Sequence, residues 1–469
     1  MGGLLQILGF DKMTDVKEII DESMLEGILD RTKNPSDVKV RGILDKALEK
    51  RGLDLEDIGW LVNSDGKNHI EMMFDAAGKI KREIYGERLV LFAPLYLSNH
   101  CVNNCEYCGF RTGVSLPRKK LSMDEIRSQV RVLEDMGHKR LLLEFGEHPE
   151  ENDIDYVVDV IKTIYGTKSG KGEIRRVNVN IASTSVEDYK KLKEAGIGTY
   201  QLFQETYHRK TYESIHNGPK ADYERQLLAH DRAFEAGIDD IGLGVLFSLY
   251  DYRFEVLGLV SHAQYLERKY GVGPHTFSVP RWQKARGLSW EPEHPVSEKE
   301  LLKVIAILRL AVPYTGMIIS TRESPETRKK AFEIGISQTS AASRTSPGGY
   351  GEALELSQFS LSDHRSVSEV IESILKQDLV PSFCTACYRT GRTGEAFMEI
   401  AKPGDIQRLC RPNALLTLKE YLEDYASEGV KRLGEKVLDK YLRKIPGDRR
   451  AETESRLKRI ESGERDIYF

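Results

Sequence analysis

Residues 89–108 read LVLFAPLYLSNHCVNNCEYC, an apolar run that leads directly into three closely spaced cysteines. The run over residues 89–97 shows little alternation of polar and apolar side chains, which is typical of a parallel strand covered on both faces. It has about half the length that a membrane-spanning helix requires. We therefore expect a buried strand whose carboxyl end carries the cysteines.

Seven similar runs follow along the chain, each with a helix-like segment behind it. The eight predicted strands are residues 89–97, 140–145, 176–181, 199–203, 240–247, 275–279, 317–321 and 336–340. Ser122 and Glu125 form the capping-box pattern of a helix start, and Gly196 and Gly237 suit helix ends. Eight strand–helix units in one run predict an α/β fold, a (β/α)8 TIM barrel over residues 88–377, with a doubly wound sheet as the alternative.

The chain outside the predicted barrel forms two extensions. Residues 1–87 are mostly helical in pattern, and residues 378–469 carry three more cysteines ahead of a charged, helix-prone tail. We expect a helical N-terminal extension, a central barrel and a C-terminal auxiliary domain.

The composition argues against a nucleic-acid-binding or membrane protein. Of 469 residues, 69 are Lys or Arg and 73 are Asp or Glu, which gives a net charge of -4 without a long basic run. Six cysteines in two groups of three are too few for a disulfide framework. We therefore expect a cytoplasmic protein with reduced thiols.

The first cysteine triad is Cys101, Cys105 and Cys108. It follows the first predicted strand, at the barrel face where active sites are built. A [4Fe–4S] cluster needs four ligands, so three thiolates leave one iron open to a small molecule. A zinc site completed by His100 is the alternative.

The second triad is Cys384, Cys387 and Cys410, in the spacing Cys-x2-Cys-x22-Cys. It also lacks a fourth cysteine, which favours a second cluster with an open iron over the fragment of a zinc ribbon. The last predicted barrel helix, residues 366–377, returns the chain to the bottom of the barrel. We therefore expect the two triads more than ~20 Å apart, so that a small intermediate has to travel between them.

The spacing Cys-x3-Cys-x-aromatic-Cys, with Tyr107 as the aromatic residue, resembles the signature of radical S-adenosylmethionine (SAM) enzymes. The resemblance implies that the open iron chelates SAM, and that electron transfer from the cluster cleaves SAM to methionine and a 5′-deoxyadenosyl radical. It also implies SAM contacts near the ends of successive strands. The cofactor-binding candidates are Tyr107, Gly146, Glu147, Asn180, Glu205, Arg225 and Leu246. Taken singly, such residues are more often structural, and only their common location at strand ends favours a binding role.

The two triads together resemble the tyrosine lyase family of [FeFe]-hydrogenase maturases. That resemblance implies two [4Fe–4S] clusters and SAM as cofactors. It implies cleavage of the Cα–Cβ bond of L-tyrosine to p-cresol and dehydroglycine, and conversion of dehydroglycine to CO and cyanide at the second cluster. The implied product is an iron–carbonyl–cyanide unit for the hydrogenase H-cluster. An electron donor, cysteine as a ligand of an extra iron and other maturation proteins are the implied partners.

Two other readings stay open. Segments 204–207, 320–323 and 343–350 also resemble related aromatic amino-acid lyases, including the 2-iminoacetate synthase of thiamine biosynthesis, which lacks the second triad. A lyase of that kind would stop at dehydroglycine, with a structural C-terminal metal site. The remaining reading is a metal-binding scaffold or a zinc-dependent barrel hydrolase.

Three catalytic candidates lie at the predicted top of the barrel. Arg322 offers a fork of donors for the substrate carboxylate, while Tyr96 and Ser340 either line the same pocket or pack in the barrel wall. His275 opens the sixth strand at the opposite end. It is either a packed histidine or, as the resemblance suggests, a ligand of the extra iron.

Overall fold

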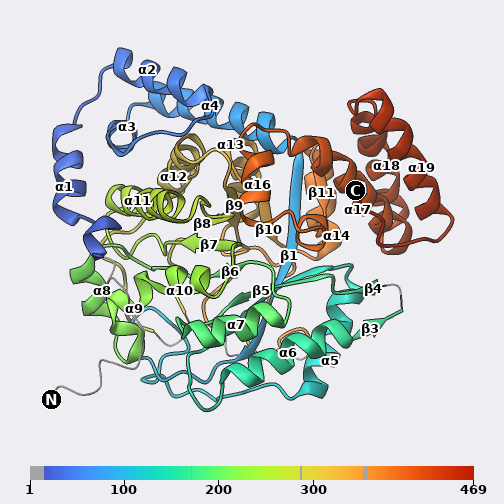
Figure 1. Cartoon of the computed structure of the whole chain (residues 1–469), viewed down its shortest axis with the longest axis horizontal. Coiled ribbons are helices and arrows are strands. Elements are labelled where there is room, and N and C mark those ends of the chain that lie inside the picture. The colour runs from blue at the N-terminus through green and yellow to red at the C-terminus, as the bar shows by residue number, and fades with distance from the viewer. Residues whose placement is uncertain (1–14, 171, 286–287, 352–356) are drawn as a thin grey trace.

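The computed structural model describes residues 15–170, 172–285, 288–351 and 357–469. Among these residues, no helix combines the length and apolar character needed to cross a membrane. The first described segment is helical and packs mainly on the barrel helices α11 and α12 (Figure 1). Its elements are η1 (Val16–Glu18), α1 (Glu22–Arg31), α2 (Asp37–Leu48), α3 (Leu55–Val62) and α4 (Lys67–Tyr85).

Eight parallel strands form the centre of the molecule. They are β1 (Arg88–Ser98), β2 (Arg140–Phe145), β5 (Arg176–Asn180), β6 (Tyr200–Gln201), β7 (Ile241–Gly244), β8 (Thr276–Ser278), β9 (Gly316–Ile319) and β10 (Gln338–Ser340). Each strand pairs with the next in this order, and β10 pairs back with β1, so the sheet is closed. The predicted TIM barrel is confirmed, and the closure excludes a doubly wound sheet.

Helices cover the outside of the barrel. They are α5 (Met123–Asp135), α6 (Ile154–Gly166), α7 (Val186–Glu194), α8 (Arg209–Ile215), η2 (Pro219–Ala221), α9 (Tyr223–Leu227), α10 (Ala229–Glu235), α11 (Tyr252–Tyr270), α12 (Glu298–Ala311), α13 (Pro325–Ile334) and α14 (Val367–Lys376). The capping box of Ser122 and Glu125 opens α5 as predicted. A small hairpin, β3 (Lys168–Ser169) and β4 (Gly172–Glu173), follows α6.

A short strand that the sequence pattern did not predict, β11 (Val380–Ser382), pairs in parallel with the first residues of β1. It places the following segment at the amino end of β1. This segment consists of α15 (Ala386–Arg389), α16 (Gly394–Ala401), α17 (Gln407–Asp424), α18 (Glu428–Leu442) and α19 (Gly447–Glu461). Figure 1 shows α18 and α19 beside the barrel.

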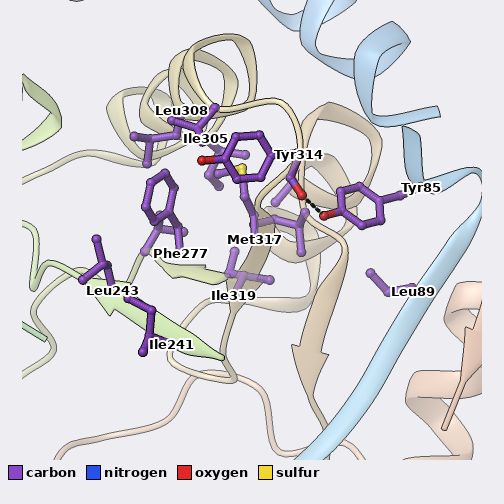
Figure 2. Close-up of a cluster of buried hydrophobic side chains, with 14 of the residues drawn as sticks. Tyr85, Leu89, Ile241, Leu243, Phe277, Ile305, Leu308, Tyr314, Met317 and Ile319 are labelled. Atoms are coloured by element: carbon purple, nitrogen blue, oxygen red, sulfur yellow. Dashed lines mark hydrogen bonds between the residues drawn. The ribbon is translucent and has the colours of Figure 1, made fainter. Parts of the chain in front are cut away.

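The main apolar core lies between the strands and the helices (Figure 2). Phe277 lies beside Ile305 and Leu308 of α12, and Ile241 and Leu243 of the neighbouring strand belong to the same cluster of buried side chains. Because side chains alternate along a strand, their neighbours face the barrel interior.

Those inward neighbours are polar or small. Gln201 donates a hydrogen bond to Thr276 (Nε2–Oγ1 3.3 Å). A Cβ on Gly242 would lie 2.5 Å from the Thr276 hydroxyl, and a Cβ on Gly316 would lie 2.9 Å from the amide nitrogen of Gln338. The middle of this barrel is therefore lined by amides, a hydroxyl and glycines as well as by aliphatic side chains.

Candidate functional site

The loop that carries the first triad lies at the carboxyl ends of the strands and is anchored on both sides. The backbone N–H of Val102 donates to the carbonyl of Glu147 (2.7 Å), and that of Glu106 donates to Ile215 (3.0 Å). Gly146 is required for the close approach, because a Cβ there would lie 2.3 Å from the carbonyl oxygen of His100. The predicted glycine thus shapes the cysteine loop.

A cavity of about 1010 Å³, counting the space open to solvent at its mouth, lies beside this loop. Its lining brings together eight of the residues predicted from the sequence: Tyr96, Tyr107, Cys108, Asn180, Glu205, Leu246, Arg322 and Ser340. The cavity also reaches the middle layer of the barrel at Leu142 and Gln201. Gly146, Glu147 and Arg225 are not part of its lining.

Several polar groups around the cavity are held by neighbours. Tyr96 donates its hydroxyl hydrogen to Gln358 (Oε1, 2.7 Å), and Gln358 in turn lies 3.8 Å from the Cys108 sulfur. The Tyr107 hydroxyl is 2.9 Å from Nε2 of His216. Burial raises the pKa of Tyr96 well above its usual value, so the phenol stays neutral.

Charged side chains at this end of the barrel form two ion pairs. Arg225 binds Glu147 at 2.7 Å, and Lys220 binds Glu205 at 2.6 Å. The first contact connects two residues that the sequence analysis had singled out separately, and the second gives the predicted Glu205 a partner that it had not singled out.

Arg322 and Glu144 have no such partner among the described residues. The Arg322 guanidinium lies 3.3 Å from the ring centre of Phe359, and burial lowers its pKa. Glu144 accepts a hydrogen bond from Asn180 (Nδ2–Oε2 2.9 Å), and burial raises its pKa to about 8.

The second triad lies at the other end of the barrel. Cys384 follows β11, which pairs with the start of β1, and Cys410 lies on α17. Burial raises the pKa of Cys410, and the nearby thiols of Cys387 and Cys384 raise it further, so the three are close together. The two triads are thus separated by the length of β1, whose 11 residues span roughly 30 Å.

Cationic and aromatic side chains lie between the barrel floor and the second triad. The guanidinium groups of Arg140 and Arg176 lie 5.1 and 4.5 Å from the ring centre of Tyr388. His275 packs against Tyr388 and, at 4.2 Å between ring centres, against Phe397. The structure therefore places His275 next to the C-terminal segment, where the sequence put it.

Comparisons with known proteins agree with this geometry. A model of the radical SAM superfamily matches residues 95–252, and one of the biotin and thiamin synthesis associated domain matches residues 278–380. The 2-iminoacetate synthase of Salmonella typhimurium is 32% identical over 346 residues, which cover 73% of this chain and 90% of that protein.

Two solved structures extend the match to nearly the whole chain. A crystal structure of HydG, described as a maturase of the [FeFe]-hydrogenase, is 53% identical and superposes with a TM-score of 0.94, covering 96% of this chain and 100% of that one. The chain belongs to the HydG family of radical SAM enzymes. HydG from Carboxydothermus hydrogenoformans is 39% identical with a TM-score of 0.83, covering 95% of this chain and 100% of that one.

Membership of the radical SAM superfamily implies a SAM-binding [4Fe–4S] cluster, and the first triad of this HydG-family enzyme fits it. Burial raises the pKa of the Cys105 thiol, and neighbouring Cys108 and Cys101 raise it further. Such thiols become thiolates when a cationic centre binds them. Among the residues that the structure describes, no group of three or more His, Cys, Asp or Glu side chains is arranged to hold a single metal ion.

Sequence reasoning about the HydG-family site missed Glu144, Lys220 and Gln358. Glu144 left a readable signal, because it is a single acidic residue in the apolar strand LLLEF. Lys220 lies in the short 3-10 helix η2 and Gln358 in an irregular segment, both far along the chain from the first triad, and no local pattern marks them.

Proposed function

We propose that this HydG-family enzyme is a carbon–carbon lyase that cleaves the Cα–Cβ bond of L-tyrosine to p-cresol and dehydroglycine. The observation that carries the proposal is the cavity beside Cys108, which combines aromatic walls with the guanidinium of Arg322, a cation without a carboxylate partner among the described residues. Phe92 and Phe203 line it and suit an aromatic ring. The likeness to 2-iminoacetate synthase over the barrel supports the same substrate class.

The first triad and its surroundings would hold the radical-generating cofactor. When bound, the cluster and SAM supply a carbon radical that removes a hydrogen atom from the substrate. Cys101, Cys105 and Cys108 hold the cluster. The SAM-binding residues proposed from the sequence are Tyr107, Gly146, Glu147, Asn180, Glu205, Arg225 and Leu246. The ion pairs of Glu147 and Glu205 fix the positions of their carboxylates.

Arg322 would bind the substrate carboxylate through two parallel hydrogen bonds, the geometry for which a guanidinium is suited. Tyr96 and Ser340 would shape the pocket around the substrate. The hydrogen bond of Tyr96 to Gln358 keeps its ring in place.

We further propose that Cys384, Cys387 and Cys410 hold a second [4Fe–4S] cluster, at which dehydroglycine yields CO and cyanide. His275, with free cysteine as another ligand, would bind an extra iron that leaves as an iron–carbonyl–cyanide product for [FeFe]-hydrogenase maturation. The polar middle layer of the barrel, including Gln201, supports passage of a small polar fragment. An electron donor and other maturation proteins would be the partners.

The three-part division of the chain is also proposed, with a helical extension in residues 1–87, the barrel in residues 88–377 and an auxiliary cluster domain in residues 378–469. Residues 1–14 of the extension lie outside the described residues.

The test is product formation by anaerobically reconstituted enzyme with SAM, tyrosine and a reductant. We expect about eight iron atoms per chain and p-cresol formed in proportion to 5′-deoxyadenosine. SAM cleavage without p-cresol would overturn tyrosine as the substrate. Formation of p-cresol without CO would favour the alternative, a lyase like 2-iminoacetate synthase that stops at dehydroglycine.

A further inference from the structure

Four acidic side chains lie on or just after the carboxyl ends of barrel strands, and three of them already have a cationic partner. The pairs are Glu147 with Arg225 at 2.7 Å, Glu205 with Lys220 at 2.6 Å, and Glu323 with Arg281 at 2.6 Å. Glu144 is the exception, because no described Lys, Arg or His lies within ion-pair distance of its carboxylate.

Glu144 is also the one of these four acids that lies within a strand, β2. In the barrel register it lies between Tyr96 of β1 and Asn180 of β5, and all three line the cavity. Its one side-chain hydrogen bond, from Asn180, comes from a neutral amide. A carboxylate in such a place is costly to ionise unless a cation joins it.

Arg322, on another wall of the same cavity, is a cation that lacks an anionic partner in the part of the chain that the structure describes. It has no carboxylate partner among the described residues, and its neighbour is the ring of Phe359. One unpaired carboxylate and one unpaired guanidinium therefore face a common cavity. This arrangement is the electrostatic complement of an amino acid in its zwitterionic form.

We propose that Glu144 binds the α-ammonium group of the substrate and accepts a proton from it. The ammonium nitrogen loses one proton to a carboxylate oxygen, which leaves a neutral amine and a neutral carboxylic acid and needs no oxidant or reductant. The amine then carries the N–H hydrogen that is removed as an atom. The inference rests on the proposed function, because it requires an amino acid in this cavity.

The environment of Glu144 suits this proton transfer. Burial raises the pKa of Glu144 to about 8, near the range in which amino groups titrate. Because the donor and the acceptor then have similar pKa values, the proton transfer costs little free energy. Among the charged groups around it, Arg322 and Lys220 lower the pKa and Glu205 raises it, while the Asn180 hydrogen bond lowers it.

The experiment compares two ligands on the reconstituted enzyme with SAM: tyrosine, and 3-(4-hydroxyphenyl)propanoate, which lacks the amino group. In Glu144→Gln we expect the Kd for tyrosine to rise about ten- to hundredfold, with the Kd for the propanoate unchanged. At saturating tyrosine, p-cresol formation should fall about a hundredfold. Glu144→Asp should restore part of both losses, because it keeps the charge.

Glu134→Gln is the matched control. Glu134 also has a pKa raised by burial, to about 7, but it lies on α5 outside the cavity, so neither Kd should change. Equal weakening of both ligands by Glu144→Gln, or unchanged tyrosine binding, would overturn the ammonium contact. Unchanged turnover at saturation would overturn the proton transfer. A wild-type enzyme that binds neither ligand would instead overturn the proposed function itself.

Discussion

The half-buried Arg322 lies with its guanidinium over Phe359 and has no carboxylate partner among the described residues. If it binds the substrate carboxylate, Arg322→Gln should raise the Kd for tyrosine about ten- to hundredfold, because a charge-assisted bidentate contact is lost. Tyramine, which lacks the carboxylate, should bind the variant and the wild type equally. Isothermal titration with both ligands measures this. A parallel loss of tyramine binding would mean that Arg322 acts on the pocket's shape.

His275 offers a test at the opposite end of the barrel. Burial lowers the pKa of this imidazole, and its Nδ1 lies 3.3 Å from Asp240. We expect His275→Ala to lose the electron paramagnetic resonance signal of the extra iron while p-cresol formation persists. His294→Ala is the control, because that ring packs on Tyr250 instead. An unchanged iron signal in His275→Ala would contradict the assignment.

Residue chemistry made part of the site readable from sequence. The cysteine spacing indicated two cluster sites, because few residue types ligate iron–sulfur clusters. The position of Arg322 at a strand end indicated a carboxylate site, because few residue types bind a carboxylate through two parallel hydrogen bonds. Glu144 was missed although a lone acid in a buried strand is itself a signal. Gln358 was out of reach, because its contact with Tyr96 joins positions 262 residues apart.

At the level of elements, the predicted strands are in the right places but mostly too long. The run 240–247 contains a strand of four residues, Ile241–Gly244, because the chain leaves the barrel and turns into the cavity mouth while remaining apolar. The sequence analysis missed β11 because a strand of three residues is too short to show an alternation of polar and apolar side chains, and its central residue, Pro381, is rare within strands.

Asp363 connects elements around the barrel mouth. Its fully buried carboxylate pairs with Arg328 of α13 and with Arg365 at 2.7 Å. Asp363→Asn leaves the Arg328 charge without its partner, so the free energy of unfolding at pH 7 should fall by about 3–5 kcal/mol in urea titrations. Asp124→Asn, at a side chain that is 93% exposed, should change it by less than about 1 kcal/mol.

The effect of Asp363 has a defined pH dependence. Burial alone would raise its pKa, but the Arg365 hydrogen bond and the Arg328 charge lower it below the ordinary value. A carboxyl with a lowered pKa stabilises the fold above its unfolded pKa of about 4 and loses that contribution as the pH falls through the folded value. The difference in free energy of unfolding between the wild type and Asp363→Asn should therefore become smaller below pH 4. A difference in free energy of unfolding that stays constant with pH would contradict the ion-pair explanation.

For the molecule as a whole, the count of strand–helix units predicted barrel closure, whereas the nature of its interior was not foreseen. Short strands such as Thr276-Phe-Ser278 alternate polar and apolar residues, and the polar ones face inward. This alternation is visible in the sequence, but only the strand pairing shows which face is the inside. The polar interior matters because the proposed chemistry needs a route between the two ends.

Separate reactions at the two ends of the barrel are the central claim, and one measurement tests it directly. Cys384 and Cys387 are changed together to Ala, and p-cresol and CO are measured after adding SAM, tyrosine and reductant, with deoxymyoglobin as the CO trap. We expect p-cresol to form at a rate close to that of the wild type and CO to disappear. Loss of both products together, or CO formation without the second triad, would contradict two remote sites.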